Sequence, residues 1–171
     1  MAGLYENQKT LRSIHTLIKK INMKHVNVFF VTSYPRSDMG KGTFIAQALN
    51  VVNNSDAIKF DGLLNTNENG RHTEKGHDDF GIYEAFNPNK QFGKEHYILA
   101  GEIYQDFIAK YGENENLQLN PHLSYYLEYK IMYIWNQIGR PKNLFIEIGG
   151  VMTDFEVAPL FKSIIKHFIK D

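Results

Sequence analysis

Two apolar, β-branched runs in this chain end in charged, glycine-rich segments, and a helical pattern follows each of them. Residues 26–33 lead to the turn at 40–43, and residues 144–148 carry Glu147 and lead to two glycines. Strands that alternate with helices are typical of a parallel sheet covered on both faces. Such sheets bind ligands outside the carboxyl ends of their strands. A lysine and a carboxylate brought there by two different strands indicate magnesium-nucleotide chemistry.

Apolar periodicity predicts the order of the elements. Strands are expected over 26–33, 57–61 and 144–148, with a further short strand considered over 117–119. Helices are expected where apolar residues recur at intervals of three or four, over 11–21, 44–52, 103–111, 123–138 and 160–168. Residues 62–94 show almost no periodicity, which is typical of a functional or disordered loop. The pattern predicts an α/β fold with a mostly parallel sheet flanked by helices.

Length and composition predict one domain. The chain has 171 residues, of which 43% are hydrophobic. That is enough for one sizeable core but short for two. We therefore expect a single nucleotide-binding domain over 1–171, with an extra N-terminal helix within 1–25 and a long irregular active-site loop over 62–96.

Charge and cysteine usage exclude several classes of function. Lys plus Arg and Asp plus Glu both number 19, and this zero formal charge argues against a dedicated nucleic-acid binder. There is no cysteine, which excludes disulfides, thiolate metal sites and cysteine nucleophiles. No apolar run approaches the roughly 18 residues of a membrane span, and the first residues lack the features of a signal peptide. A cytoplasmic protein without membrane contact is expected.

The segment Gly40-Lys41-Gly42-Thr43 has the second half of a phosphate-binding loop. In such loops glycines let backbone N–H groups approach phosphate oxygens, the helix N-terminus adds positive potential, and a lysine neutralises the terminal phosphates. Pro35 stands where the common pattern has its first glycine. We expect Lys41 to be a solvated side chain directed at phosphate, and the alternative is a plain strand-to-helix turn.

Carboxylates at two places favour a cation site. Glu147 ends an apolar strand, where an unpaired charge is costly to bury, so a cation or a lysine should lie nearby. Asp79 lies in the long loop, and magnesium typically takes one or two carboxylates together with phosphates and waters. Asp79 and Glu147 are therefore predicted to approach one another at the carboxyl end of the sheet. Lys59 and Asp61 end the second strand, where a surface ion pair is the alternative.

Two further groups are interpreted as structural. His72 and His77 share the long loop but lack metal-ligand spacing. The aromatic residues of the helix over 123–138 are more typical of a core or a subunit contact than of a base-stacking platform. These are Tyr125, Tyr126, Tyr129, Tyr133 and Trp135.

A series of short motifs covers most of the chain in a specific order. They are Phe30-Val31-Thr32, Met39-Gly40-Lys41-Gly42, Lys59-Phe60-Asp61 followed by Asn65, Asp79-Phe80-Gly81-Ile82-Tyr83-Glu84-Ala85-Phe86, Gly101-Glu102-Ile103-Tyr104, Pro121-His122, and Glu147-Ile148-Gly149-Gly150 followed by Asp154-Phe155-Glu156. Through these motifs, residues 28 to about 166 resemble the N-terminal synthetase (amidoligase) domain of the CTP synthase family. The resemblance implies a P-loop NTPase-like three-layer fold.

In that family ATP phosphorylates the uracil 4-oxygen of UTP, and ammonia then displaces the phosphate to give CTP. The resemblance implies catalytic roles for Lys41 and Lys59, which would steady the transferring phosphoryl group, and a Mg²⁺ site at Asp79 and Glu147. The implied ATP-binding residues are Asp38, Met39, Gly40, Lys41, Gly42, Thr43 and Asp79. The implied pyrimidine-nucleotide residues are Ser37, Asp61, Asp154, Phe155 and Glu156.

The chain also departs from the family pattern. Ser33-Tyr34-Pro35 replaces two glycines, and the segment between Asn65 and Asp79 is shorter. We expect these 171 residues to lack the basic segment that holds the UTP triphosphate and the glutamine-hydrolysing domain.

Three functions stay open at this stage. The first is an amidoligase that uses free ammonia or ammonia from a separate subunit, or a small P-loop kinase or ligase. The second is a degenerate module that binds ATP, UTP or CTP without turnover. The third is an interaction subunit that docks on itself, as a homo-oligomer, or on a larger synthase. In each case the expected small-molecule partners are nucleoside triphosphates, and no nucleic acid is expected.

Overall fold

The computed structural model describes residues 25–34, 36, 40–64, 72–73, 76–77, 79–113, 118, 122–151, 153–154 and 157–158. A four-stranded sheet forms the centre of this part of the chain, and all of its strand pairs are parallel. In spatial order its strands are β1 (Asn27–Val31), β6 (Asn143–Ile148), β2 (Ser55–Asp61) and β5 (Tyr97–Leu99). The predicted α/β class with a parallel sheet is confirmed.

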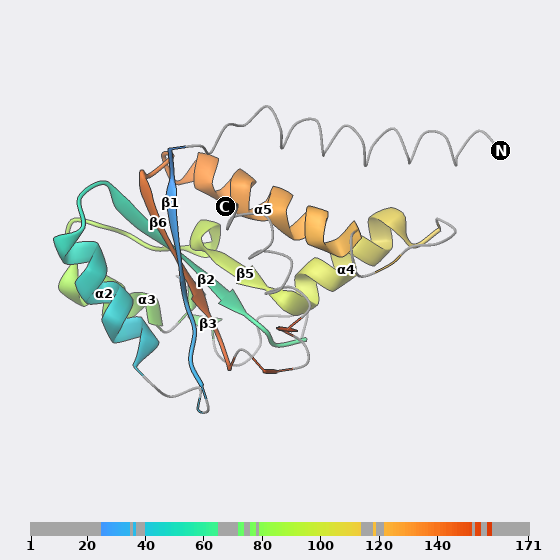
Figure 1. The fold of residues 1–171 in the computed structure, drawn as a ribbon, viewed down its shortest axis with the longest axis horizontal. Coiled ribbons are helices and arrows are strands. Elements are labelled where there is room, and N and C mark those ends of the chain that lie inside the picture. The colour runs from blue at the N-terminus through green and yellow to red at the C-terminus, as the bar shows by residue number, and fades with distance from the viewer. Residues whose placement is uncertain are drawn as a thin grey trace.

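Helices cover both faces of the sheet and complete three layers (Figure 1). The helices on one face are α2 (Lys41–Val51) and α3 (Asp79–Phe86), and those on the other are α4 (Ala100–Tyr111) and α5 (Ser124–Gln137). A 3-10 helix spans Lys94–His96, and a small antiparallel pair is formed by β3 (His72–Thr73) and β4 (Gly76–His77). In the part of the chain that the structure describes, no helix is long and apolar enough to cross a membrane.

The central strands divide their side chains between two cores. Ile58 and Phe60 of β2 belong to the core beneath α4 and α5, whereas Ala57 belongs to the core beneath α2 and α3. Since successive side chains of a strand point to opposite faces, Lys59 lies on the α2/α3 side with Ala57. Glu147 of β6 lies on that side too, because its side chain contacts α3. The alternation thus brings two charged side chains to one face of the sheet.

Several predicted elements differ from the structure or lie outside it. Residues 62–96 are not irregular throughout, because they contain α3, whose Phe80 and Tyr83 are buried. The three-residue strand β5 was not predicted. Of residues 117–119 only Gln118 is described, and it belongs to no strand. The expected helices over 11–21 and 160–168 lie outside the described residues, and the single domain over 1–171 stays a prediction.

The aromatic residues of α5 build core, as one of the two interpretations predicted. Tyr126 and Trp135 are buried in the cluster beneath α4 and α5, and Tyr129 packs partly against it. The Trp135 indole N–H donates to the Pro141 carbonyl at 2.9 Å, which satisfies the polar end of the ring. Tyr133 is 52% exposed, so it contributes little to this core.

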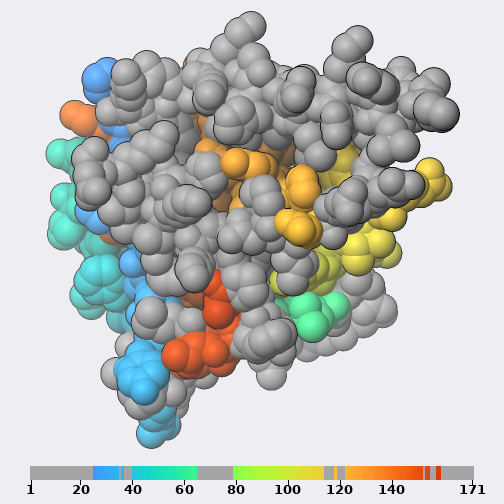
Figure 2. Space-filling view, turned by 45° about the vertical axis from the view of Figure 1, so that its right-hand side comes forward, coloured from blue at the N-terminus to red at the C-terminus, as the bar shows by residue number. Residues whose placement is uncertain are grey.

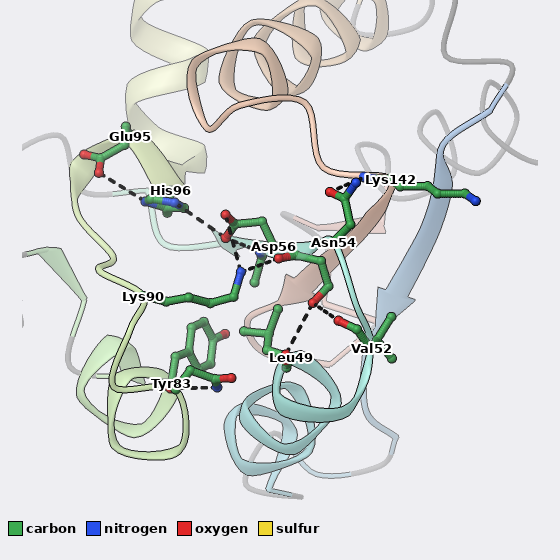
Figure 3. A network of polar contacts seen from close by, with 12 residues as sticks. Leu49, Val52, Asn54, Asp56, Tyr83, Lys90, Glu95, His96 and Lys142 are labelled. Carbon is green, nitrogen blue, oxygen red and sulfur yellow. Dashed lines mark hydrogen bonds and ion pairs between the residues drawn. The ribbon is translucent and has the colours of Figure 1, made fainter.

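A polar network ties the loop before β5 to the start of β2, at the end of that strand remote from its carboxyl terminus (Figure 3). Asp56 Oδ1 accepts from the Ala57 amide at 2.8 Å and lies 3.6 Å from His96 Nε2. Asp56 Oδ2 lies 3.9 Å from Lys90 Nζ. Glu95 Oε1 lies 3.3 Å from the other ring nitrogen of His96. The network fastens the connection between α3 and β5 to the sheet.

Replacing Asp56 by Asn is expected to raise the melting temperature at neutral pH. Burial raises the pKa of Asp56 above its ordinary value, and Lys90, the Ala57 amide and His96 oppose this shift only in part. The ionised carboxylate therefore disfavours folding, and stability is lost as the pH rises through the raised, folded-state pKa. The advantage of the Asn variant should disappear below pH 3.8, the ordinary value, where the folded and unfolded chains both carry the proton.

Thermal unfolding of both proteins across this pH range measures the effect. Glu95→Gln is a matched control, because it makes the same chemical change on a carboxylate of the network whose side chain is 55% exposed. It should change the melting temperature little, since exposed ion pairs contribute little. A wild type that is more stable than Asp56→Asn at neutral pH would show that the ion pairs outweigh the burial cost.

Candidate functional site

The centre of the candidate site is a buried ion-pair group at the carboxyl end of the sheet. Lys59 of β2 and Glu147 of β6 are directly opposite in register. Lys59 Nζ lies 2.5 Å from Glu147 Oε1 and 2.6 Å from Oδ2 of Asp79, the first residue of α3. The predicted approach of Asp79 and Glu147 is confirmed. The alternative of a surface ion pair between Lys59 and Asp61 is wrong, because Lys59 is only 4% exposed and pairs with the other two acids.

Electrostatics keep this lysine charged. Burial by itself would lower the pKa of Lys59, but the charges and hydrogen bonds of Glu147 and Asp79 outweigh burial and raise it above its ordinary value. A desolvated ammonium is stable only with such paired carboxylates around it. Lys59 is therefore protonated and positively charged in the folded chain.

Tyr83 holds the second oxygen of Glu147. Its hydroxyl donates to Glu147 Oε2, and its side chain is fully buried. Burial, followed by the negative charge of Glu147 and this hydrogen bond, raises the pKa of Tyr83 well above its ordinary value, so the phenol stays a donor. Glu147 is thus held from two sides, by a strand neighbour and by a helix.

The first turn of α2 lies beside these carboxylates. Gly40 adopts the left-handed conformation with φ 71°, which a glycine tolerates best, and its carbonyl accepts from the Phe44 amide at 3.0 Å. A Cβ atom on Gly42 would lie 3.7 Å from Asp79 Cγ and 3.8 Å from Glu147 Oε2. The turn that could receive phosphate and the acids that could receive its cation are therefore neighbours.

Lys41 is not the solvated side chain that the sequence led us to expect. It is 7% exposed, and Nζ donates to the Gly150 carbonyl at 2.5 Å and to Ser33 Oγ at 3.1 Å. Ser33 Oγ in turn donates to the same carbonyl at 3.2 Å. Burial and the nearby charge of Lys59 lower the pKa of Lys41, and the surrounding acids offset this only in part. Ser33 thus helps to hold this lysine.

The ends of β2 and β6 are joined by a close backbone contact. The Gly149 amide donates to the Phe60 carbonyl at 2.6 Å, and a Cβ atom on Gly149 would lie 3.1 Å from that oxygen, so a larger residue there would have to push the two strand ends slightly apart. Asp61 Oδ1 then accepts from the Leu63 amide at 3.2 Å, and Asp154 Oδ2 accepts from the Val151 amide at 2.9 Å. The Asp61 and Asp154 carboxylates thus stabilise the backbone turns that follow β2 and β6.

A cavity of about 730 Å³ opens at this edge of the sheet. Its charged lining residues are Lys41, Lys59, Asp61, Asp79, Glu147 and Asp154, and its apolar ones are Leu63, Leu64, Ile82 and Val157. In the space-filling view, the segments that follow β1 (blue) and β6 (orange-red) reach the surface next to each other (Figure 2). A pocket with mixed charge and an apolar rim can hold the phosphates and the base of a nucleotide.

The structure brings together most of the residues predicted from the sequence. Gly40, Lys41, Gly42 and Thr43 line the same cavity as Lys59, Asp61, Asp79, Glu147 and Asp154. The predicted site residues Ser37, Asp38, Met39, Phe155 and Glu156 lie outside the described residues.

Sequence reasoning did not assign Ser33, Tyr83 or Gly149 to the site. Only Tyr83 had a usable signal, since it lies four residues after Asp79 and therefore on the same face of a helix. That signal depends on recognising α3 within a segment that has almost no periodicity.

The acids fit a cation that is shared with phosphate. Among the described residues, no group of three or more His, Asp or Glu side chains could hold a metal by itself. The Lys59 ammonium nevertheless contacts both Asp79 and Glu147, so one positive charge is already accommodated between them. Two carboxylates with phosphates and waters are a usual donor set for magnesium.

Three features together define a P-loop-like α/β domain. They are the parallel sheet, the glycine–lysine turn at the start of a helix, and the charged cavity at the carboxyl ends of the strands. The family follows from comparison with known proteins. Residues 27–170 match the family model described as CTP synthase N-terminus. The chain belongs to this family.

Similar proteins support this assignment. The chain is 29% identical over 170 residues to the CTP synthase of Phytoplasma australiense and 28% identical over 163 residues to that of Campylobacter jejuni. These matches cover 85% and 83% of the chain but 29% of each relative. The CTP synthase of Methanosarcina mazei is 32% identical over 90 residues, which are 50% of the chain and 16% of that protein. The chain spans less than a third of the length of these relatives.

Proposed function

We propose that this chain is an ATP-dependent amidoligase domain of the CTP synthase type. It binds Mg²⁺-ATP, transfers a phosphoryl group to a pyrimidine nucleotide such as UTP, and allows ammonia to replace that group. The observation that carries the proposal is the contact of Lys59 with Asp79 and Glu147 beside the first turn of α2. Two lysines and two acids from four separate elements meet where a phosphoryl group has to be positioned.

Each group has a role in phosphoryl transfer, which asks a protein mainly for positioning and charge stabilisation. The backbone N–H groups of residues 38–43 cradle the ATP phosphates at the N-terminus of α2. Lys41 and Lys59 offset the charge that develops on the transferring group. Asp79 and Glu147 would hold Mg²⁺, which would neutralise negative charge on the phosphates. Tyr83 keeps the Glu147 carboxylate oriented.

The remaining lining residues are available for the acceptor nucleotide. Asp61 and Asp154 line the cavity together with Leu63, Leu64 and Val157. We assign Ser37, Phe155 and Glu156 a role in binding the acceptor nucleotide as well, because Ser37 shortly precedes residues 40–43 in the sequence and the other two follow Asp154 directly. Carboxylates can accept hydrogen bonds from ribose hydroxyls, and the apolar side chains can contact a base.

A second candidate is a nucleotide-binding module without turnover. The contacts of Lys41 favour it, because this lysine donates to the protein's own Gly150 carbonyl and Ser33 hydroxyl. A lysine held in this way has to leave two partners before it can reach a phosphate. Docking on a larger synthase or on a second copy of the chain is a further prediction from the sequence.

The purified chain, incubated with ATP, magnesium and UTP, is expected to form CTP and ADP slowly with ammonium and to form no CTP with glutamine. Glutamine hydrolysis in the related family needs a cysteine thiolate, and the chain has no cysteine. Chromatography separates the nucleotides, and a Glu147→Gln variant measures the background. CTP made from glutamine by the purified chain would overturn this assignment. If the chain binds Mg²⁺-ATP but forms neither ADP nor CTP, the nucleotide-binding module without turnover is favoured.

A further inference from the structure

Lys59 occupies the point at which the two proposed metal ligands face one another. Its ammonium lies 2.5 Å from Glu147 Oε1 and 2.6 Å from Asp79 Oδ2. These are the contacts that a cation bridging the two carboxylates would make. We propose that Lys59 is an internal counterion that competes with the divalent cation for Asp79 and Glu147. The inference rests on the proposed function and adds to it a rule for when the site accepts metal.

The hydrogen bonds of Glu147 show which group has to yield. One carboxylate oxygen contacts Lys59 and the other accepts from Tyr83, so a cation that binds at the bonded position of either oxygen takes the place of one of these partners. The Tyr83 ring is fully buried and packs against Phe80 and Phe92 with ring centroids 5.7 and 5.2 Å apart. A close-packed aromatic ring moves at a high cost. The Lys59 side chain is unbranched and flexible, so Lys59 is the partner that yields.

The cavity lining contains two lysines and four carboxylates, and its formal charge of −2 attracts a divalent cation. The position of the Lys59 ammonium between Asp79 and Glu147 favours exchange over joint binding. The Lys59 ammonium and a divalent cation between the same two carboxylates would repel one another at short range. A nucleotide phosphate beside the first turn of α2 offers the displaced ammonium a new anionic partner. Cation binding and nucleotide binding are then coupled, and each increases the affinity for the other.

The test measures metal binding in the absence of nucleotide. Wild type, Lys59→Gln and Lys59→Met are titrated with Mn²⁺, and both the apparent Kd and the melting temperature are followed. Removal of the competing ammonium should lower the apparent Kd by about tenfold or more, which corresponds to about 1.4 kcal/mol. It should also make the melting temperature of the variants rise more with Mn²⁺ than that of the wild type.

Lys41→Gln is the matched control. It removes the same charge from the same cavity, but Lys41 Nζ bonds to Gly150 and Ser33 rather than to the two acids. A general change in electrostatic potential would increase the Mn²⁺ affinity in both kinds of variant. Displacement predicts a clear gain only for the Lys59 variants.

The outcomes are decisive even if a variant folds poorly. A Lys59 variant that is unfolded alone and folds on addition of Mn²⁺ supports the proposal. If neither Lys59 variant gains affinity or stability from Mn²⁺ beyond the wild type and Lys41→Gln, the proposal is overturned. Calorimetry of Mg²⁺-ATP with the wild type, done in parallel, tests the proposed function separately. If the wild type binds Mg²⁺-ATP but the Lys59 variants gain no affinity for Mn²⁺, only the counterion role of Lys59 is rejected.

Discussion

Glu147→Ala is expected to lower the melting temperature by roughly 6–12 °C. The Glu147 side chain is 2% exposed and shares Lys59 with the more exposed Asp79. Removing one member of a buried ion pair typically costs about 3–5 kcal/mol, because the other charge is left without compensation. We expect about 3 kcal/mol, since Asp79 remains, and about 2–4 °C per kcal/mol for a chain of this length. Thermal unfolding followed by circular dichroism measures the change.

Two variants separate the ion pair from the general loss of a side chain. Asp79→Ala should lower the melting temperature by less than half as much, because the Asp79 side chain is 30% exposed and Glu147 still compensates Lys59. The double variant Lys59→Met/Glu147→Leu should recover only part of the loss, since apolar replacement of a buried pair is often neutral but the buried Tyr83 hydroxyl loses its acceptor. A Glu147→Ala protein that melts at the wild-type temperature would show that the pair does not contribute to the fold.

Lys41→Ala is expected to weaken binding of Mg²⁺-ATP roughly 10- to 100-fold. Hydrogen bonds to charged groups are worth about 1.5–3 kcal/mol, and Lys41 is the lysine of the first turn of α2. The melting temperature should change by less than in Glu147→Ala, because burial lowers the pKa of Lys41 and so already disfavours its charged form in the folded chain. Calorimetric titration with ATP, with and without magnesium, measures the affinity.

Lys142→Ala is the control for this experiment. Lys142 is exposed and precedes β6, at the end of the sheet remote from the cavity. Its removal changes the net charge in the same way and should leave the ATP affinity unchanged. Equal affinity of wild type and Lys41→Ala for ATP would mean that residues 40–43 form only a strand-to-helix turn.

The amino-acid sequence by itself determined the elements whose signals are local. Apolar periodicity predicted β1, β2 and β6 and the helices α2, α4 and α5, because burial of one face imposes a period that a short window can detect. It also placed Lys59 and Glu147 at strand ends, since each interrupts or closes an apolar run. The carboxyl ends of parallel strands meet at one edge of the sheet. The approach of Asp79 and Glu147 was predicted there because the buried charge of Glu147 needs a compensating cation.

The tertiary structure alone decided which partners those charges have. Strand order is not encoded in local periodicity, and only the position of β6 between β1 and β2 sets Glu147 in register with Lys59. The contact of Lys41 with Gly150 joins residues 109 positions apart, and the lysine that was expected to be solvated is buried there. The eight-residue α3 and the three-residue β5 are too short for an apolar period to show. Packing against the sheet stabilises such short elements, so tertiary contacts and not local sequence determine them.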